Sequence, residues 1–335
     1  MVLKMGELFK INNENEIEFN SEILLTTFSE KEKRRMKEFE KVIFLRQKGF
    51  LPSQISRLLG IPKQRVASWL FANKKPIAVN AIEICKKRGL LPMRTDLKRF
   101  IVLLDIFSWI FGDGNLGKTL NTITLSGRKN DLEKIAKSIT SAFGFKCEIK
   151  TAPGSKNKDN CALIIRGKGT RALCRLLKGL GAPVGNKVEK AFLLPQWVFL
   201  LKPKLKKRLL EVFMSNEIGI GHLEKNGQMP CIRIKMRKTK KEVQNLIGFL
   251  NQIGVLLKEF GIKVSEAKIV KEVVDNKGVK CDVVLNISKA IRNVFTFSST
   301  FKMIFAKEKQ ERLEILKEAA ERKMNLNENF NFIIQ

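Results

Sequence analysis

The stretch LKRFIVLLDIFSWIFGDG, residues 97–114, decides how the rest of the chain is interpreted. Its long apolar run predicts a buried helix that stops at the sequence Gly-Asp-Gly. Ser108 and Gly112 are four positions apart and share one face of that helix, so another helix could approach this strip of small residues closely. We expect Gly114 to supply the backbone freedom that ends the helix. Asp113 then lies beside unpaired helix-end carbonyls, whose negative potential favours a bound cation.

A second stretch, KKRLLEVFMSNEIG at residues 206–219, repeats this plan of a basic start, an apolar run and an acid at the end. The two acids are Asp113 and Glu217. Taken alone, residues 97–114 also fit a buried helix with a glycine stop, which would need no further function. The second copy weakens that interpretation, because chance does not readily place an acid at the end of two such helices.

The paired stretches resemble the two signature helices of the single-chain LAGLIDADG homing endonucleases. IFSWIFGDG at residues 106–114 and LEVFMSNEI at residues 210–218 match that nine-letter motif. The resemblance implies two helices packed side by side. It also implies that Asp113 and Glu217 hold the divalent metal, Mg²⁺ or Mn²⁺, with which this family cuts DNA.

The second copy departs from the motif. Val212 and Asn216 replace small residues, and Ile218 stands where glycine is expected. If these changes displace the end of the second helix, Glu217 no longer reaches the site. Two alternatives therefore stay open beside the endonuclease: a non-catalytic DNA-binding transcriptional regulator, similar to the sporulation-regulator family WhiA, and an RNA maturase.

The charge of the chain indicates a polyanionic partner. Its 335 residues contain 64 Lys and Arg against 33 Asp and Glu, a net charge of +31, which is more than solubility alone requires. Double-stranded DNA is the expected partner. No segment reaches the ~18 consecutive apolar residues of a membrane span, and the N-terminus lacks the pattern of a signal peptide. We therefore expect a cytoplasmic protein with no membrane partner.

Cysteine and histidine usage argues against a metal cage built from these residues. The six cysteines are scattered with no Cys-x-x-Cys pair, and His222 is the single histidine. Neither a zinc site nor a disulfide framework is indicated, and we expect all six thiols to be reduced. Metal-assisted hydrolysis by carboxylates needs no histidine base and agrees with this composition.

Residues 42–70 predict three helices, broken at Gly49 and at Gly60. Gly60 suits a left-handed turn and Pro62 the first turn of the next helix, so the last two helices resemble a helix-turn-helix. Their apolar faces are formed by Ile55, Leu58 and Leu59 and by Val66, Trp69 and Leu70. The residues that would face a DNA major groove or nearby phosphates are Lys63, Gln64, Arg65, Ser68, Lys74 and Lys75. A plain helical hairpin is the alternative.

Beyond a linker at Pro92, two runs of the same element order follow. The first has strand-like text at residues 121–126, 145–151 and 161–166 and helix-like text at 131–143 and 170–180. The second has strands at 231–237, 262–270 and 280–287, a helix at 241–260 and helical text from 288. We predict an α+β fold of two pseudo-symmetric αββαββα LAGLIDADG repeats, residues 93–200 and 201–335. They follow an unassigned segment, residues 1–29, and an all-α helix-turn-helix domain, residues 30–92.

The strand PCIRIKMR, residues 230–237, has the clearest alternation in the chain. It places Ile232, Ile234 and Met236 on one face and Arg233, Lys235 and Arg237 on the other. Solvated sheet faces usually mix both signs, so three cations in succession favour a surface that contacts DNA. Comparable outward places in the first repeat belong to Thr122, Thr124, Ser126 and Arg128, with Arg166 nearby.

The segment GLGAPVGNKVEKAFLLPQWV, residues 179–198, resembles the end of the first repeat in archaeal-type and intein-borne LAGLIDADG domains. That resemblance implies that Lys187 lies near the metal, where it stabilises charge on the cleaved phosphate or orients water; a solvated loop lysine is the alternative. The similar position in the second repeat is Lys302, in FSSTFK at residues 297–302. No intein splice ends are visible in the sequence.

The sequence therefore predicts a site-specific, divalent-metal-dependent endonuclease of the homing type that acts on double-stranded DNA. Two acids from two repeats allow one cut in each strand by a monomer with internal pseudo-two-fold symmetry. The expected catalytic side chains are Asp113, Glu217, Lys187 and Lys302.

Overall fold

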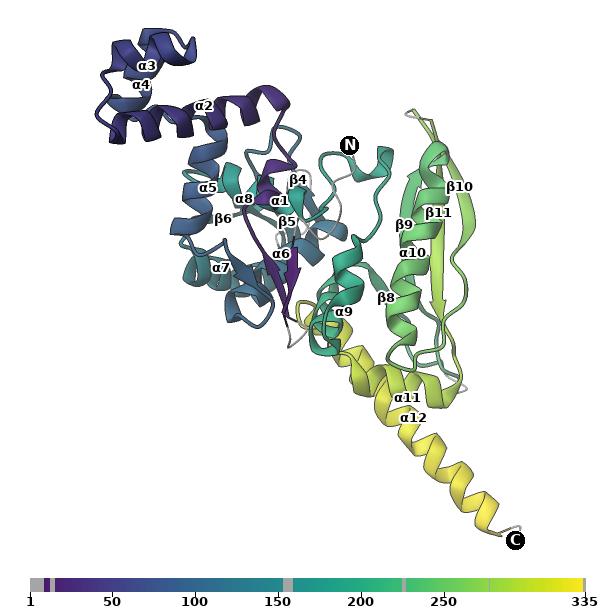
Figure 1. Ribbon diagram of the computed structural model, residues 1–335. Helices are drawn as coiled ribbons and strands as arrows, with labels where there is room; N and C mark the ends of the chain where they lie inside the picture. The colour runs from purple at the N-terminus through teal and green to yellow at the C-terminus, as the bar shows by residue number, and fades with distance from the viewer. Residues whose placement is uncertain (1–8, 13–15, 153–158, 225–226, 277, 334–335) are drawn as a thin grey trace.

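The computed structural model describes residues 9–12, 16–152, 159–224, 227–276 and 278–333. It mixes helices with antiparallel sheets (Figure 1). One small sheet has the strand order β1-β2-β3, and two four-stranded sheets belong to the rest of the chain. In these described ranges no helix is long and apolar enough to cross a membrane.

Two runs of elements have the same order. The first consists of α6 (Lys98–Phe111), β4 (Gly114–Leu116), β5 (Ile123–Arg128), α7 (Lys129–Phe143), β6 (Cys147–Thr151), β7 (Asn160–Ile165) and α8 (Thr170–Gly179). The second consists of α9 (Pro203–Glu217), β8 (Ile218–Ile220), β9 (Ile232–Thr239), α10 (Val243–Lys258), β10 (Lys268–Asp275), β11 (Gly278–Ile287) and α11 (Ile291–Thr300). The strand orders β4-β5-β7-β6 and β8-β9-β11-β10 correspond position by position. Each run therefore reads αββαββα, and each begins with a helix that leads to one of the acids.

Helices α6 and α9 pack against each other where the two runs meet. The small face predicted from the sequence lies at this contact: Ser108 is buried, and a Cβ added at Gly112 would lie 3.0 Å from the Cβ of Asn216. Asn216 turns its amide back onto its own helix, where Nδ2 donates to the carbonyl of Val212 at 3.2 Å. Gly112 leaves the room that the larger Asn216 needs, so this departure from the motif does not separate the helices.

Gly114 does not end α6 in the way the sequence suggested. The helix ends at Phe111, and Gly114 does not have a positive φ. It is the first residue of β4, and a Cβ there would lie 2.8 Å from the Cα of Ile110 and from the carbonyl oxygen of Trp109. Glycine is required because the strand starts in contact with the helix that precedes it.

One predicted strand is displaced. The pattern at residues 262–270 predicts a strand over that whole range, but β10 begins at Lys268. Ile262 is buried in the core, and Val264 makes an isolated bridge to Ile287. The apolar residues that indicated a strand therefore anchor a connecting segment instead.

The N-terminal segment is part of the main core. β1 (Phe9–Ile11) pairs with β2 (Ile17–Phe19), and β2 pairs with β3 (Met93–Arg94). Phe19 is fully buried, and its ring meets that of Trp197 edge-on at a centroid distance of 5.3 Å. The boundary predicted at Pro92 therefore does not divide the core, because residues on both sides of it pack against the first run.

The helices before Pro92 are α1 (Glu22–Leu25), α2 (Glu30–Gln47), α3 (Pro52–Leu59), α4 (Lys63–Leu70) and α5 (Ile77–Lys87). The far end of α2 projects from the body with α3 and α4 (Figure 1), and these helices share a small separate core: Phe39, Val42, Ile55, Ile61, Val66 and Trp69. Gly60 has the left-handed φ of 64° that the sequence indicated. Two details differ. Leu58 is 61% exposed on the side of α3 away from this core, and Pro62 precedes α4 instead of lying in its first turn.

The remaining elements connect the runs or follow them. The short 3-10 helices η2 (Lys187–Glu189) and η3 (Gln196–Leu200) lie between α8 and α9, and η4 (Lys240–Glu242) precedes α10. The indole N–H of Trp197 donates to the carbonyl of Leu180 at 2.9 Å, which ties this connection to the end of α8. The last helix, α12 (Lys307–Ile333), extends away from the body towards the C-terminus (Figure 1).

Candidate active site

The two predicted acids end the two packed helices. Asp113 follows α6 after Gly112, and Glu217 is the last residue of α9. Burial raises the pKa of both carboxyl groups, that of Glu217 to about 7, and the negative charge of Asp113 is the second cause of the shift at Glu217. A Cβ added at Gly112, the residue before Asp113, would lie 3.4 Å from Glu217 Cγ, so the fold brings the two acids close together.

A pocket of about 190 Å³ lies beside Asp113, and its lining includes Ser215, Asn216, Phe305 and Lys309. The side chain of Asp113 is exposed, whereas that of Glu217 is half-buried. The walls of the pocket exclude part of the water around Asp113, which explains how an accessible carboxyl group still has a raised pKa. A ligand could therefore reach Asp113 directly from solvent.

Two lysines stand beside the acids in matching ways. Lys187 Nζ donates to the carbonyl of Ile110 at 2.8 Å and also to that of Gly112. Lys309 Nζ donates to the carbonyls of Ser215 and Asn216 at 2.8 and 2.7 Å. Burial lowers the pKa of Lys187 to about 8 and also lowers that of Lys309, while Asp113 and Glu217 oppose both shifts. Each ammonium therefore binds the carbonyls just before one acid.

Lys302 is not the second of these lysines. Its side chain is exposed, and its backbone N–H donates to Glu211 Oε1 at 3.1 Å. Similarity to a short motif pointed to Lys302, but the spacing from the closing helix points elsewhere. Lys187 lies eight residues after the end of α8, and Lys309 lies nine residues after the end of α11. The two lysines thus follow their closing helices at similar distances, but the sequence alone did not show where the second closing helix ends.

The two acids suit a divalent cation such as Mg²⁺. Carboxylate oxygens are hard donors, and Mg²⁺ keeps several waters or takes phosphate oxygens for the rest of its shell. Burial and, second, the charge of Asp113 raise the pKa of Glu217 to about 7, and a bound cation would offset the cost of ionising Glu217 beside Asp113. In the described part of the chain no cluster of three His, Cys, Asp or Glu side chains forms a metal cage. The residues present therefore fit a metal shared with substrate and water.

Strand β9 has the two faces that its alternation predicted, but two of its three outward cations have an acidic partner. Arg233, Lys235 and Arg237 on β9 are exposed, while Ile232 and Ile234 are buried and Met236 is half-buried. However, Asp282 of β11 forms ion pairs with Lys235 at 2.7 Å and with Arg237 at 2.5 Å, and these partners hold its pKa at about 2. The face therefore mixes signs, because the neighbouring strand supplies an acid that the alternation within β9 does not reveal.

Arg233 differs from its two neighbours on the strand. It lies opposite Gly219 and Asn286 in the sheet register, so no acid faces it. Within the described ranges Arg233 forms no ion pair. It is therefore the cation of this row that is most available to a ligand.

The outward surface of the first sheet also carries both positive and negative side chains. Ser126 and Arg128 are exposed, and Thr122 and Thr124 are half-buried. Arg128 pairs with Glu308 of α12 at 2.5 Å, and Arg166 pairs with Glu148. The predicted residues thus share the outward surface, but both arginines have acidic partners.

The predicted helix-turn-helix residues lie on the outside of α4 and the turn after it. Lys63, Gln64 and Lys74 are exposed, and Arg65, Ser68 and Lys75 are half-buried. Arg65 contacts Glu38 at 3.7 Å, and Lys75 pairs with Glu83 at 2.7 Å. Lys63 and Lys74 are thus the cations of this group that are fully presented to solvent.

A buried lysine that the sequence did not single out supports the segment carrying Lys187. Lys238 Nζ donates to the carbonyl of Lys190 at 2.5 Å and to Asn245 Oδ1 at 2.7 Å, and it lies 4.0 Å from the centre of the Phe192 ring. Burial lowers the pKa of Lys238 to about 8. The predicted strand ended at residue 237, whereas β9 continues to Thr239 and places Lys238 on its buried face, where it anchors the connection between the runs.

Comparison with known proteins gives relatives of several kinds. No protein-family model matches the chain. The tRNA-splicing ligase RtcB of Pyrococcus abyssi is 28% identical over 205 residues, which are 59% of this chain and 22% of that protein. The DNA-directed RNA polymerase subunit Rpo1N of Methanocaldococcus jannaschii is 27% identical over 190 residues, or 53% and 14%. The archaeal Lon protease of Pyrococcus abyssi is 30% identical over 135 residues, or 40% and 12%. The chain spans about a fifth or less of the length of these curated relatives.

Two solved structures have a partly similar arrangement. I-DmoI in complex with DNA and Ca matches 61% of this chain and 91% of that chain, with a TM-score of 0.38 and 15% identity. Full-length DUF199/WhiA from Thermatoga maritima matches 75% of this chain and 72% of that chain, with a TM-score of 0.37 and 14% identity.

The raised pKa of Glu217 predicts how stability depends on pH in the absence of metal. A folded-state pKa of about 7, against 4.5 in a free side chain, favours the folded state at low pH, and this contribution is lost as pH rises through about 7. The shift corresponds to roughly 3 kcal/mol at most. In urea titrations with a chelator, Glu217→Gln should therefore lose less stability than the wild type between pH 5.5 and 8. The exposed Glu266 supplies the control, since Glu266→Gln should follow the wild type. Equal pH dependence of all three proteins would contradict the placement of Glu217.

Proposed function

We propose that this chain is a divalent-metal-dependent double-stranded DNA endonuclease of the LAGLIDADG homing type. One observation carries the proposal: two packed helices each lead to an acid, Asp113 or Glu217, and a lysine donates hydrogen bonds to the carbonyls just before each acid. An isolated buried helix with a glycine stop explains neither the second acid nor the two lysines. The arrangement gives two similar half-sites within one chain, so a monomer suffices to act on both strands.

The two αββαββα runs support this reading at the level of the fold. Their central helices meet at the acids, and their sheets present hydroxyl and cationic side chains outward. The two strands of duplex DNA are themselves related by two-fold symmetry, so two similar half-sites match two similar backbones. The helix pair α3 and α4 is proposed as a helix-turn-helix that adds contacts through Lys63, Gln64 and Lys74.

The chemistry follows from these side chains. Asp113 and Glu217 would hold the cation, Mg²⁺ or Mn²⁺, which when bound lowers the pKa of a water and offsets charge on the phosphate. Lys187 and Lys309 lie at the same helix ends, where a positive charge can stabilise the phosphate oxygens as negative charge develops. Their hydrogen bonds to helix-end carbonyls keep both ammonium groups oriented before a substrate arrives.

The altered second motif does not argue for a non-catalytic regulator. Ile218 stands where glycine was expected, yet Glu217 remains the last residue of α9. Ile218 begins β8 and pairs with Ile234, as Gly114 begins β4 and pairs with Leu125. The change therefore leaves Glu217 at the helix end, next to Asp113.

The activities in the names of the relatives cannot be assigned to this chain. A ligase, a polymerase subunit and a protease each resemble part of this chain, over stretches that make up 22%, 14% and 12% of their lengths. Because their activities differ and each resemblance covers a small share of the relative, none of these activities is assigned to this chain. A module carried within longer proteins of different function agrees with an endonuclease of the homing type.

The test is incubation with a randomised duplex library and Mg²⁺ or Mn²⁺, followed by sequencing of cut ends. We expect recurrent double-strand ends at one sequence family, absent when a chelator is added. A protein that binds one duplex tightly but neither cuts nor nicks it would support the regulator instead. A parallel arm with structured RNA tests the maturase alternative.

The assignment of Lys309, and not Lys302, as the second lysine beside the acids gives a direct prediction. Lys309→Ala should slow cleavage on the order of 10²-fold with little change in duplex affinity, because a charge near the phosphate is removed. Lys309→Arg keeps the charge and should recover part of the rate. Lys302→Ala is the matched control and should cleave within about twofold of the wild type, since its side chain is exposed and makes no contact at the acids. Single-turnover cleavage of the selected duplex measures all three, and a larger loss from Lys302→Ala than from Lys309→Ala would contradict the assignment.

The ion pairs on β9 predict unequal effects of its cations on binding. Arg233→Ala should weaken duplex binding and reduce the salt dependence by about 0.9 in the logarithmic slope for each phosphate that the side chain neutralises. Lys235→Ala should do less, because Asp282 already partly neutralises Lys235. Asp282→Asn should strengthen binding by releasing two cations. Anisotropy titrations across a salt series measure these effects, with the exposed Lys258→Ala as control. Equal losses from Arg233→Ala and Lys258→Ala would remove β9 from the interface.

A further inference from the structure

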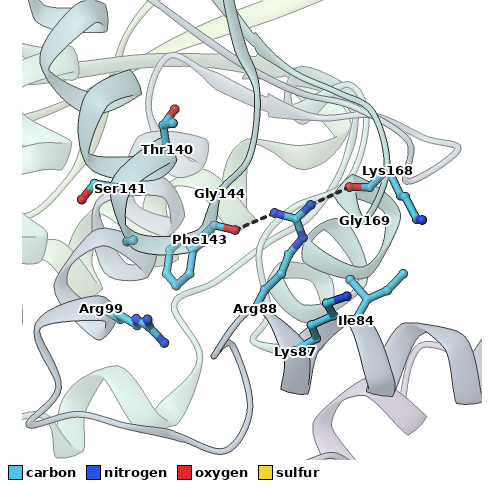
Figure 2. Close-up of a pocket in the computed structure, with 11 residues that line it drawn as sticks. Ile84, Lys87, Arg88, Arg99, Thr140, Ser141, Phe143, Gly144, Lys168 and Gly169 are labelled. Carbon is cyan, nitrogen blue, oxygen red and sulfur yellow. Dashed lines mark hydrogen bonds between the residues drawn. The ribbon is translucent and has the colours of Figure 1, made fainter.

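A second concave site lies away from the acids, where α5, α6, α7 and α8 converge. It is a pocket of about 550 Å³ between the end of α5, the start of α6, the end of α7 and the turn before α8 (Figure 2). Four cations line it: Lys87, Arg88, Arg99 and Lys168. Its eleven lining residues include no acid.

The high charge of the whole chain does not by itself explain this lining. A pocket of similar size, about 620 Å³, is lined by five cations and five acids and is therefore balanced. In the described part of the chain none of the four cations of the first pocket takes part in an ion pair. The positive charge here is left for a ligand from outside the chain.

Arg88 gives the pocket a fixed centre. Figure 2 shows its guanidinium between two walls, where Nη1 donates to the carbonyl of Phe143 at 2.6 Å and Nη2 donates to that of Lys168 at 3.1 Å. The guanidinium also lies 4.3 Å from the centre of the Phe145 ring. Two of the five N–H groups of Arg88 are used in this way, so the group is held in place while other donors stay unused.

Two glycines allow this close arrangement. A Cβ at Gly169 would lie 3.0 Å from Arg88 Nε, and one at Gly144 would lie 3.3 Å from Arg88 Nη1. Both have positive φ, 94° and 66°. Arg88 compensates the negative end of α7 through the Phe143 carbonyl, but Lys87, Arg99 and Lys168 make no such bond within the described ranges. Helix-end compensation thus accounts for Arg88 and, by its place in the last turn of α5, for Lys87, but not for Arg99 and Lys168.

We propose that this pocket binds a phosphate group. Fixed guanidinium and mobile ammonium groups around a cavity without acids are the donors that phosphate prefers. Lys168 lies two residues beyond Arg166, in the turn between β7 and α8, and both side chains are exposed. A nucleic-acid backbone that continues past the sheet edge could therefore place a phosphate here, and this source rests on the proposed function. A free phosphate compound is the other source of the same chemistry.

The test compares Lys87→Ala/Arg99→Ala/Lys168→Ala with Lys204→Ala/Lys258→Ala/Lys317→Ala, a triple variant of equal charge at exposed positions elsewhere. All six side chains are exposed, so both proteins should fold, and thermal melts check this; the three single variants replace the triple if it melts early. One arm measures affinity and salt slope for a short and a long duplex. The other measures thermal stabilisation by pyrophosphate against chloride at equal ionic strength.

If the ligand is a phosphate of the nucleic-acid backbone, the pocket variant should lose more affinity for the long duplex than for the short one. Its salt slope should also be smaller, while the control variant should show neither change. If the ligand is a free phosphate compound, the pocket variant should lose only the thermal stabilisation by pyrophosphate. If pocket variant and control behave alike in both arms, the proposal is overturned. A wild-type protein that does not bind DNA would refute the proposed function, yet the pyrophosphate arm would still decide whether the pocket binds phosphate.

Discussion

Asp113→Asn and Glu217→Gln are each expected to abolish double-strand cleavage, with a rate loss on the order of 10³-fold or more. Each change keeps the shape of the side chain and removes the negative charge that would hold the cation. Duplex affinity measured without metal should stay close to that of the wild type, because neither acid lies on the outward sheet faces. At pH 8 without metal, Glu217→Gln should also be more stable than the wild type, because it removes a charge that burial and, second, the nearby Asp113 disfavour.

The two variants together also test the equivalence of the half-sites. If the helix ends contribute alike, both single variants fail to make double-strand breaks. If only Asp113→Asn abolishes activity and the wild type only nicks, the second half-site lacks its cation in spite of the position of Glu217. Glu266→Gln is the matched control, since it removes an exposed acid and should leave cleavage unchanged. Full cleavage by both Asp113→Asn and Glu217→Gln would exclude these acids from the chemistry.

The acids and their helices could be predicted because their signal is local. An apolar run and a terminal acid lie within one helix in each run, and the first helix also carries the small-residue face formed by Ser108 and Gly112. The alternation in β9 likewise predicted which residues of the strand face the core and which face outward. Patterns of period 3.6 or 2 report the environment of a residue within its own element.

What the sequence did not predict depends on contacts between elements. Asp282 neutralises Lys235 and Arg237 from the neighbouring strand, and no pattern within β9 contains it. Lys309 reaches the acids from α12, and its role depends on the path of the chain after α11. The need for glycine at position 114 comes from contact with the preceding helix and not from the φ angle that its place in the motif suggested.

The packing of α6 on α9 includes an ion pair between the buried Asp105 and the half-buried Arg208, and this pair occurs once, not twice. Asp105 accepts two hydrogen bonds from Arg208, from Nε and from Nη2, both at 2.7 Å. Asp105 is 3% exposed. Counting back from the two acids, the equivalent positions in the opposite helices are Leu209 and Leu104, which are buried as well. Only one orientation of these two helices can therefore pair the charges, and that orientation brings Asp113 and Glu217 together.

Breaking this pair from one side should be far more costly than removing it from both. Asp105→Leu would leave the Arg208 guanidinium without its partner, and Arg208→Leu would leave a buried carboxylate whose pKa is already raised by burial. Arg208→Leu, which leaves the buried carboxylate unpaired, should cost about 3–5 kcal/mol of unfolding free energy. Asp105→Leu should cost less, because the Arg208 side chain is 31% exposed and water can solvate it. The double variant Asp105→Leu/Arg208→Leu should recover most of that loss, because leucine occupies the equivalent position in each partner helix. Urea denaturation of the four proteins gives the coupling energy of the pair. A double variant as unstable as the sum of the singles would show that the charges do not act through each other, and the orientation of the two helices would then rest on apolar packing alone.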